Sequence, residues 1–171
     1  MTKPRVIHDP VHGTIILSEL EQLLIDTPQF QRLRGIQQLG LADVVFPGAN
    51  HTRFEHSVGT MHTASLLGNY LELDDDSILK LRLAGLLHDV GHSAFSHAVE
   101  SVLKRDPAIR PKINGKSFLK HEAFTRHIVS DVLPENSVIS RFVSDELGND
   151  SYEFFSEISK IATGDLSVER P

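Results

Sequence analysis

The chain has 171 residues, of which 40% are hydrophobic and 23% are charged, and its formal net charge is −6 at pH 7. This balance is ordinary for one soluble domain with its own core, and it argues against wholesale disorder and against nucleic acid as a partner. Because the chain has no cysteine, disulfides and thiolate metal sites are excluded, and a metal would need His, Asp, Glu or water as ligands.

The first forty residues predict a short β element followed by helices. Residues 5–17, RVIHDPVHGTIIL, hold two β-branched runs around a turn with Pro and Gly, which predicts a small hairpin or an extended arm. Ser18 and Glu21 have the spacing of a capping box and precede a stripe of leucines. Thr27, followed by proline, predicts the start of a second helix that continues to a stop at Gly40.

The rest of the chain predicts one loop and then further helices. Residues 44–52, VVFPGANHT, are rich in turn formers and predict a loop. A helix is expected over residues 54–71, and another begins near the acidic run 74–76 and ends or bends at Gly91. Further helical patterns cover residues 95–104, 121–132, 136–147 and 152–162. We therefore predict an all-α fold, a helical bundle with the N-terminal hairpin or arm attached, as a single domain over residues 1–171.

One segment departs from the acidic balance of the chain. Residues 104–120, KRDPAIRPKINGKSFLK, hold six of the seventeen Lys and Arg residues and a single Asp. Clustered charges of this kind usually form a solvated loop. The functional alternative is a rim that attracts phosphates.

The stretch 86–97, LLHDVGHSAFSH, places three histidines and an aspartate at the edge of an apolar run. On a helix the side chains of His88 and Asp89 point about 100° apart, yet both can reach one ion above the helix edge. Another helix must then supply a ligand, and His56 in RFEHS is the leading candidate. Two imidazoles and a carboxylate suit a divalent transition metal, which lowers the pKa of bound water. For the dipeptide alone, the alternative is a helix end with hydrogen-bonded polar side chains.

Several stretches together resemble successive motifs of the HD-domain phosphohydrolases. The segments RFEHSVGT, AGLLHDVGHSAFSH and KHEAF occur in the family's order, and IHDPVHGTI and TPQFQRLRGIQQLGLADVVFPGANHTRFEH extend the resemblance over about residues 5–125. The nearest branch is the deoxynucleoside triphosphate triphosphohydrolases. The resemblance implies an HD-domain helical bundle and a metal-dependent phosphohydrolase that releases a nucleoside and tripolyphosphate. The alternatives are another HD-type nucleotidase or phosphodiesterase, a non-haem iron oxygenase, and a non-catalytic HD-fold binding module.

The resemblance also implies roles for single residues. The positions that match three of the family's four metal ligands are His56, His88 and Asp89. The positions that match its catalytic group are His92, His121 and Glu100, where the glutamate matches the carboxylate that supports the histidines. The positions that match its substrate contacts are Arg53, for a phosphate, and Gln38 and Leu39, for the sugar pocket. His97 lies in the same region, and a structural role in the SAFSH turn is an equal alternative.

The family's fourth metal ligand is an Asp well downstream of KHEAF, in a segment that nothing before Pro171 resembles. We therefore expect the chain to lack the family's C-terminal helices and late Asp ligand, as a fragment of a longer protein or with a lost or rebuilt site. The 171 residues alone are then expected to hydrolyse deoxynucleoside triphosphates poorly or not at all. The carboxylates that remain as weak candidates after His121 are Asp131, Asp145, Asp150 and Asp165.

The implied cofactor is a divalent transition metal, and the ligand set does not distinguish Mn, Fe, Zn, Co and Ni; Mg is expected to accompany the nucleotide. The implied partners are a nucleotide substrate, further copies of the chain in a homo-oligomer, and a regulatory nucleotide at the N-terminal region. The positions that match the regulatory site are Asp26, Gln31 and Arg34, with helix start and surface charge as alternatives. No apolar run approaches a membrane span and no secretory signal is evident, so we expect no membrane partner and a cytoplasmic location.

Overall fold

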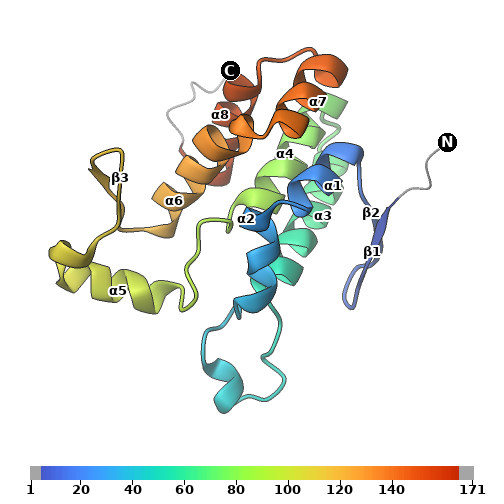
Figure 1. The fold of residues 1–171 in the computed structure, drawn as a ribbon. Helices are drawn as coiled ribbons and strands as arrows, with labels where there is room; N and C mark the ends of the chain where they lie inside the picture. The colour runs from blue at the N-terminus through green and yellow to red at the C-terminus, as the bar shows by residue number, and fades with distance from the viewer. Residues whose placement is uncertain (1–4, 166–171) are drawn as a thin grey trace.

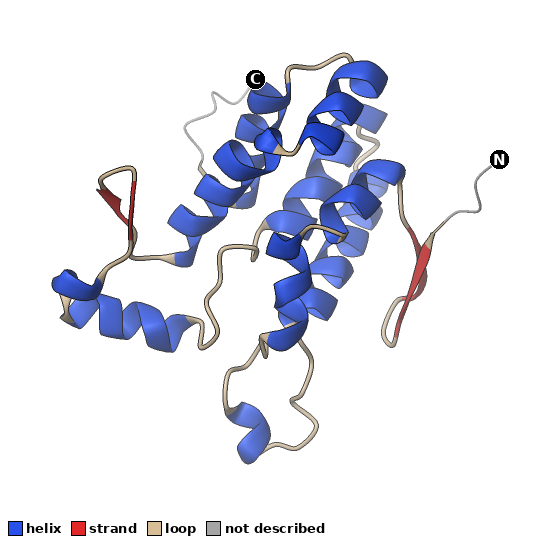
Figure 2. Ribbon diagram, viewed as in Figure 1, coloured by secondary structure: helices blue, strands red, loops and turns tan. Residues whose placement is uncertain are grey.

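The computed structural model describes residues 5–165 as a bundle of α-helices with two small β-hairpins at its margins (Figures 1 and 2). The α-helices are α1 (Glu19–Ile25), α2 (Pro28–Gln31), α3 (Arg53–Tyr70), α4 (Asp75–Leu87), α5 (His97–Arg105), α6 (His121–His127), α7 (Ser137–Leu147) and α8 (Ser151–Ala162). The short turns of 3-10 or π helix are η1 (Arg32–Gly35), η2 (Ala42–Val44), η3 (Pro107–Ile109), η4 (Ile128–Val132) and η5 (Leu133–Glu135). The strands are β1 (Val6–Asp9), β2 (Gly13–Ile16), β3 (Lys112–Ile113) and β4 (Lys116–Ser117). The predicted all-α class is confirmed.

The predicted N-terminal hairpin is present. β1 pairs antiparallel with β2, and Val6 lies opposite Ile16. The carboxylate of Asp9 accepts from the backbone N–H groups of Val11 and His12, both at 2.8 Å, and this shapes the turn. Ile15 of β2 is buried in the core and Ile7 of β1 packs against it, so apolar side chains of both strands attach the hairpin to the bundle.

The local start signals of α1 and α2 are confirmed, but the predicted length of α2 is wrong. Ser18 and Glu21 form the capping box, and the Thr27 hydroxyl accepts from the N–H of Phe30. The helix tightens into η1 after Gln31 and ends before Gly40, since Ile36 is extended. The reason is tertiary, because the backbone next to Ile36 pairs with the start of α3 through an Arg53 N–H to Ile36 O bond of 2.8 Å.

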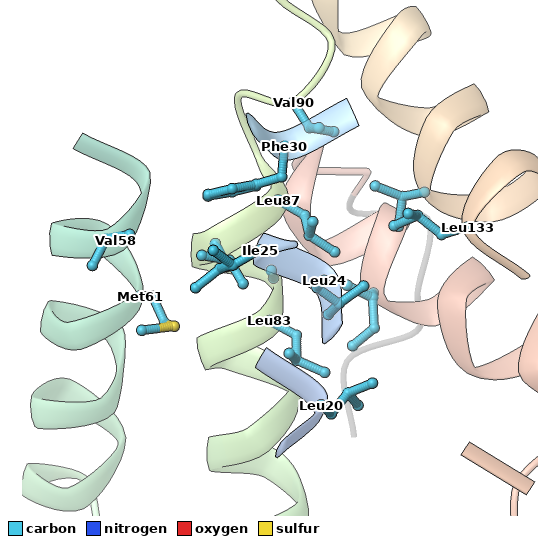
Figure 3. Packing of buried hydrophobic residues seen from close by; sticks show 14 of the residues in the cluster. Leu20, Leu24, Ile25, Phe30, Val58, Met61, Leu83, Leu87, Val90 and Leu133 are labelled. Carbon is cyan, nitrogen blue, oxygen red and sulfur yellow. The ribbon is translucent and has the colours of Figure 1, made fainter. Parts of the chain in front are cut away.

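The core is formed by side chains of α1, α3, α4, α7 and α8, with further residues from the turns between helices. Figure 3 shows Met61 of α3 and Leu83 of α4 turned toward the leucines of α1. A Cβ on Gly85 would lie 3.2 Å from the backbone of Met61, so the absence of a side chain lets α3 and α4 approach closely. Phe30 packs edge-to-face on Phe54 with ring centroids 5.3 Å apart, which joins α2 to the same core.

A buried ion pair ties the N-terminal segment to α4. Glu21 is fully buried, and its carboxylate accepts from Arg82 Nε at 2.6 Å and from Arg82 Nη2 at 3.0 Å. The other bonds of the pair reach backbone groups, because Glu21 also accepts from the Ser18 N–H and Arg82 donates to Ile16 O. One cation therefore holds α1, β2 and α4 together.

The later segments match the prediction, with one helix and one loop as exceptions. The expected helix over 121–132 is divided into α6 and η4. The segment 104–120 contains the β3–β4 hairpin, with Asn114 at φ 49° and Gly115 at φ 77° in its two-residue turn, so the interpretation as a plain loop is incomplete. Within residues 5–165, no helix is both long and apolar enough to cross a membrane.

Replacing Arg82 with Met should leave the buried Glu21 carboxylate without a cation. We expect the free energy of unfolding to fall by about 3–5 kcal/mol, measured by urea denaturation. Lys80→Met is the matched control, because Lys80 also lies on α4 but pairs with the exposed carboxylates of Asp76 and Glu157. That change should cost at most about 1 kcal/mol. Equal losses in the two variants would contradict the role given to the buried pair.

Candidate metal centre

The three predicted metal ligands come from two neighbouring helices. His56 lies in the first turns of α3, which begins after the capping box of Thr52 and Glu55. His88 is the C-cap of α4, and Asp89 follows it in the turn that leaves the helix. Because α3 and α4 lie side by side, the start of one helix and the end of the other meet at the same end of the bundle (Figure 1).

The donor atoms of these three side chains converge. His56 Nε2 and His88 Nε2 lie 3.2 Å apart, His88 Nε2 lies 3.3 Å from Asp89 Oδ1, and His56 Nε2 lies 3.8 Å from Asp89 Oδ2. Ligands that share one ion at about 2.1 Å lie roughly 3–3.5 Å from one another. The three groups therefore have the spacing of a partial coordination shell, and they form one of the potential metal-holding clusters among residues 5–165.

The protonation states of the site also fit a divalent cation. His88 Nδ1 lies 2.8 Å from the carbonyl oxygen of Gly85 and donates to it, so Nε2, which faces His56, is the ring atom available to a metal. Burial, and then the neighbouring His88, lower the pKa of His56, so its ring is neutral at pH 7. Two imidazole Nε2 atoms that face each other beside a carboxylate are the donor set that an ion of this type requires.

Asp89 lies between cationic and imidazole groups. Arg53 Nη1 makes an ion pair with Oδ2, and His92 Nε2 lies 3.3 Å from Oδ1. Burial alone would raise the pKa of Asp89, but the hydrogen bond from His92 and the charges of His88 and Arg53 outweigh it and hold the pKa well below its usual range. The carboxylate is therefore ionised at neutral pH and can bind a cation.

A second cluster lies next to this centre. The ring of His92 stacks on the ring of His121 with centroids 3.7 Å apart. Glu100 joins two histidines, with Oε1 2.6 Å from His121 Nδ1 and Oε2 3.1 Å from His97 Nδ1. The structure thus brings together the three residues of the predicted catalytic group, and it adds His97, which the sequence had left between two interpretations.

The pKa values of His92 and Glu100 in this cluster are shifted by different causes. Burial lowers the pKa of His92, whose Nδ1 has no hydrogen-bond partner among the described residues. Burial would raise the pKa of Glu100, but the backbone N–H and ring of His121 and the ring of His97 bond to it and lower this pKa to about 2. The carboxylate consequently stays charged and orients the two rings beside it.

Three residues that sequence reasoning had not singled out for the site hold the loop between α4 and α5. Arg32 donates to the carbonyl oxygens of Val90 and His92. The Thr125 hydroxyl of α6 donates to His88 O at 3.0 Å and accepts from the Gly91 N–H at 3.0 Å. A Cβ on Gly91 would overlap the backbone of α6 at Thr125 and His121. The only available sequence signal was the Gly within HDVGH, and that pattern does not identify the contact with α6.

One cavity reaches the metal centre and another reaches the histidine cluster beside it. One, of about 690 Å³, is lined by the turn of the N-terminal hairpin and by α3, and it reaches His56. The other, of about 410 Å³, is lined by His92, Glu100, His121 and Arg32. A ligand in the second cavity would contact the histidine cluster directly.

The three residues predicted to contact substrate differ in exposure and in their hydrogen bonds. Arg53 is 3% exposed, and its guanidinium also donates to Ser96 Oγ at 3.0 Å and to Gln38 O at 3.5 Å. The Oε1 of Gln38 is buried without a hydrogen-bond partner among the described residues. Leu39 is 54% exposed.

The other predicted residues do not join the centre. Within residues 5–165, no carboxylate after His121 belongs to a cluster that could hold a metal; Asp131 bonds to His127 and Asp165 bonds to Arg126. The positions expected at a regulatory nucleotide site contact other residues of the chain: Asp26 pairs with Arg5, Gln31 accepts from Arg34, and Arg34 lies 3.5 Å above the ring of Phe54.

Comparison with known proteins places this geometry in a family. The model of the HD domain matches residues 53–162. The chain is 35% identical over 153 residues to an uncharacterised protein of Methanocaldococcus jannaschii, covering 88% of this chain and 32% of that protein. It is 45% identical over 116 residues to the deoxynucleoside triphosphate triphosphohydrolase SAMHD1 of Homo sapiens, covering 64% and 18%. It is 33% identical over 164 residues to the SAMHD1 homolog of Dictyostelium discoideum, covering 90% and 29%. The chain thus spans about a third or less of the length of these relatives.

Gly91→Ala should displace α6 from the loop and with it His121. We expect a loss of about 3 kcal/mol in the free energy of unfolding, because the added Cβ meets backbone atoms that cannot rotate away. Gly35→Ala is the control, since a Cβ at Gly35 has no neighbour within 4 Å. Urea denaturation of both variants tests the contact, and a Gly91→Ala protein as stable as Gly35→Ala would disprove it.

The bonds of Glu100 should make part of the stability depend on acid. The pKa of Glu100 is about 2 in the folded chain, below the ordinary value of 4.5, so its stabilisation is complete above about pH 4.5 and is lost as pH falls toward 2. In metal-free protein, Glu100→Gln should lose less stability than the unmodified chain over this interval. Denaturation at several pH values measures the difference, and identical profiles would rule out the bonds.

Proposed function

Because the chain belongs to the HD-domain family of metal-dependent phosphohydrolases, we propose that it carries the metal and proton-transfer groups of a deoxynucleoside triphosphate triphosphohydrolase site. The net reaction would consume water and a deoxynucleoside triphosphate and yield a deoxynucleoside and tripolyphosphate. The observation that carries the proposal is the convergence of His56, His88 and Asp89 beside the cluster of His92, Glu100 and His121. The names of the human and Dictyostelium relatives support the choice of substrate.

The ion would be held by His56, His88 and Asp89, and when bound it would supply positive charge to the phosphate oxygens and make water more acidic. Arg53 orients Asp89 through their ion pair, and its guanidinium would add positive charge near the α-phosphate. Because Nε2 of His92 already donates to Asp89, the unpartnered Nδ1 of this buried ring can donate to a phosphate oxygen only when the ring gains a proton. Uptake of a proton together with the phosphate would satisfy a polar atom that otherwise lies buried without a partner among the described residues.

The leaving group of this reaction is the 5′ oxygen of the deoxyribose, which must gain a proton as the bond to phosphorus breaks. Imidazole is suited to this transfer because its ordinary pKa lies near neutral pH. The Nδ1 atoms of His121 and His97 both lie within hydrogen-bond distance of the Glu100 carboxylate, which orients the two rings. We assign the proton donor to this pair, with His121 nearer to the stacked ring of His92.

The remaining parts of the site are proposed on the same premise. Gln38 and Leu39 would contact the sugar, since Gln38 lies against Arg53 and Leu39 follows it with half of its surface exposed. A regulatory nucleotide near Asp26, Gln31 and Arg34, assembly into a homo-oligomer and a cytoplasmic location belong to the same proposal. Mn, Fe, Zn, Co and Ni all suit the imidazole and carboxylate ligands, and Mg would accompany the nucleotide.

The purified 171-residue chain should bind a divalent transition metal, and His88→Ala should lose it. Metal content after dialysis, measured by mass spectrometry, checks this, and His8→Ala is the control, because His8 lies in the N-terminal hairpin and contacts Thr14. Equal metal content in the His88 and His8 variants would exclude the centre.

With the metal supplied, hydrolysis of a panel of deoxynucleoside triphosphates should be slow, because no carboxylate after His121 joins the three ligands within the described residues. The products identified by chromatography should be deoxynucleoside and tripolyphosphate, and His88→Ala should abolish them. Release of pyrophosphate or of single phosphates instead would favour another HD-type phosphohydrolase. Metal binding with no hydrolysis at all would favour a non-catalytic module.

A further inference from the structure

The cations of residues 104–120 lie on an ordered part of the molecule. Within the hairpin, β3 and β4 pair through the Asn114–Gly115 turn, and the base is closed by a Phe118 N–H to Pro111 O bond of 2.9 Å. The Phe118 ring packs on Phe124 of α6 with centroids 5.0 Å apart. In Figure 1 the hairpin projects at one margin of the molecule, between α5 and α6. The backbone that carries these charges is therefore ordered close to the helix that begins with His121.

The cations of this segment have no carboxylate partners within residues 5–165. Its six basic residues make no ion pair there, and five of them are exposed. Arg110, the half-buried one, donates to the backbone carbonyls of Leu103 and Lys104. The six residues are Lys104, Arg105, Arg110, Lys112, Lys116 and Lys120. They create a positive field that carboxylates within the chain do not neutralise by direct pairing.

This positive field adjoins the histidine cluster. Leu119 lines both the cavity that contains His92 and His121 and a second, open depression of about 820 Å³. Lys116 and Lys120 line that second depression, and Lys120 immediately precedes His121. Phosphates that extend beyond the histidine cavity would therefore meet these two lysines.

The carboxylates in and beside the second depression lie next to other groups than the two lysines. Asp131 accepts from His127 Nδ1 at 2.8 Å and from Ser130 Oγ at 2.9 Å. Glu122 Oε2 lies 3.5 Å from His121 Nδ1. Asp165, beyond them, makes an ion pair with Arg126. None of these carboxylates makes a direct ion pair with Lys116 or Lys120, so both ammonium groups can reach a phosphate without first breaking a salt bridge within residues 5–165.

We propose that residues 104–120 form a cationic rim that binds the polyphosphate chain of an anionic ligand at the entrance to the histidine cavity. The proposal deepens the function proposed above and rests on it for its biological sense, although binding to the rim requires no hydrolysis. A compact polyphosphate suits the rim better than a long nucleic acid, because the rest of the chain holds eleven basic and twenty-two acidic residues. A ligand long enough to leave the rim would be repelled by that acidic surface.

The test is binding of inorganic tripolyphosphate to the 171-residue chain in EDTA at low ionic strength, measured by titration calorimetry. Lys116→Gln/Lys120→Gln should raise the Kd for tripolyphosphate about tenfold, or roughly threefold for each lysine charge removed from the surface. The difference should disappear in 1 M salt, where screening limits such interactions to about 3 Å. Unchanged affinity in this double variant would overturn the proposal.

Arg141→Gln/Lys160→Gln is the matched control. This variant also removes two positive charges, but from exposed positions on α7 and α8, outside the rim. It should leave the Kd for tripolyphosphate within about twofold of the unmodified chain. An equal loss in both double variants would show a general effect of net charge and would also overturn the proposal. Circular dichroism of each variant establishes that the helical fold is intact.

A single-stranded oligonucleotide of about twenty nucleotides should bind no more tightly than tripolyphosphate under the same conditions, because it must also cross the acidic surface. Tighter binding that is lost in the lysine variant would instead assign the rim to nucleic acid. The EDTA keeps this test separate from the proposed function. If the chain binds tripolyphosphate through the lysines but never hydrolyses nucleotides, the proposed rim is supported and the proposed function is contradicted. If it hydrolyses nucleotides but does not bind tripolyphosphate through the lysines, the proposed function is supported and the rim is contradicted.

Discussion

The loop that leaves α4 at His88 is held by polar contacts from several elements, and the position of the candidate site depends on them. Arg32 binds two of its carbonyl groups, the hydroxyl of Thr125 joins His88 to Gly91, and Arg53 binds the side chain of Asp89. A loop without these bonds would sample many conformations, and fixing each of its residues costs roughly 1–2 kcal/mol in conformational entropy. Because these bonds form when the domain folds, the loop is already ordered in the folded chain. The donor atoms are therefore in place before an ion or substrate binds.

The same contacts connect the two halves of the site. Oδ1 of Asp89 lies next to His88 and His92, and Oδ2 lies next to Arg53 and His56. Asp89 therefore belongs both to the metal centre and to the histidine cluster. Gly91 brings α6 close enough for His121 to stack on His92. Metal binding and proton transfer would therefore be coupled, because a shift of this loop moves groups of both kinds.

Local signals in the sequence predicted most helix starts but not every helix end. The capping box at Ser18 and the Thr27 cap are decided by neighbouring residues, and both are present in the structure. The end of α2 is decided by the backbone bonds near Ile36 with the start of α3, which no local pattern reveals. The Asn114–Gly115 turn is a different case, since its hairpin signal lay within the sequence and was obscured by the surrounding charges.

The sequence by itself determined the helical class, the residue types available to a metal and the order of the family's motifs, because these depend on periodicity, composition and spacing. Only the tertiary structure decided that His56 meets His88 and Asp89, that His97 shares Glu100 with His121, and that the basic hairpin adjoins their cavity. The physical reason is that these contacts join residues brought together by helix packing and by long loops. Their distances follow from the close approach of α3 to α4 at Gly85 and of α6 to the loop at Gly91, where the missing side chains leave room for the backbone.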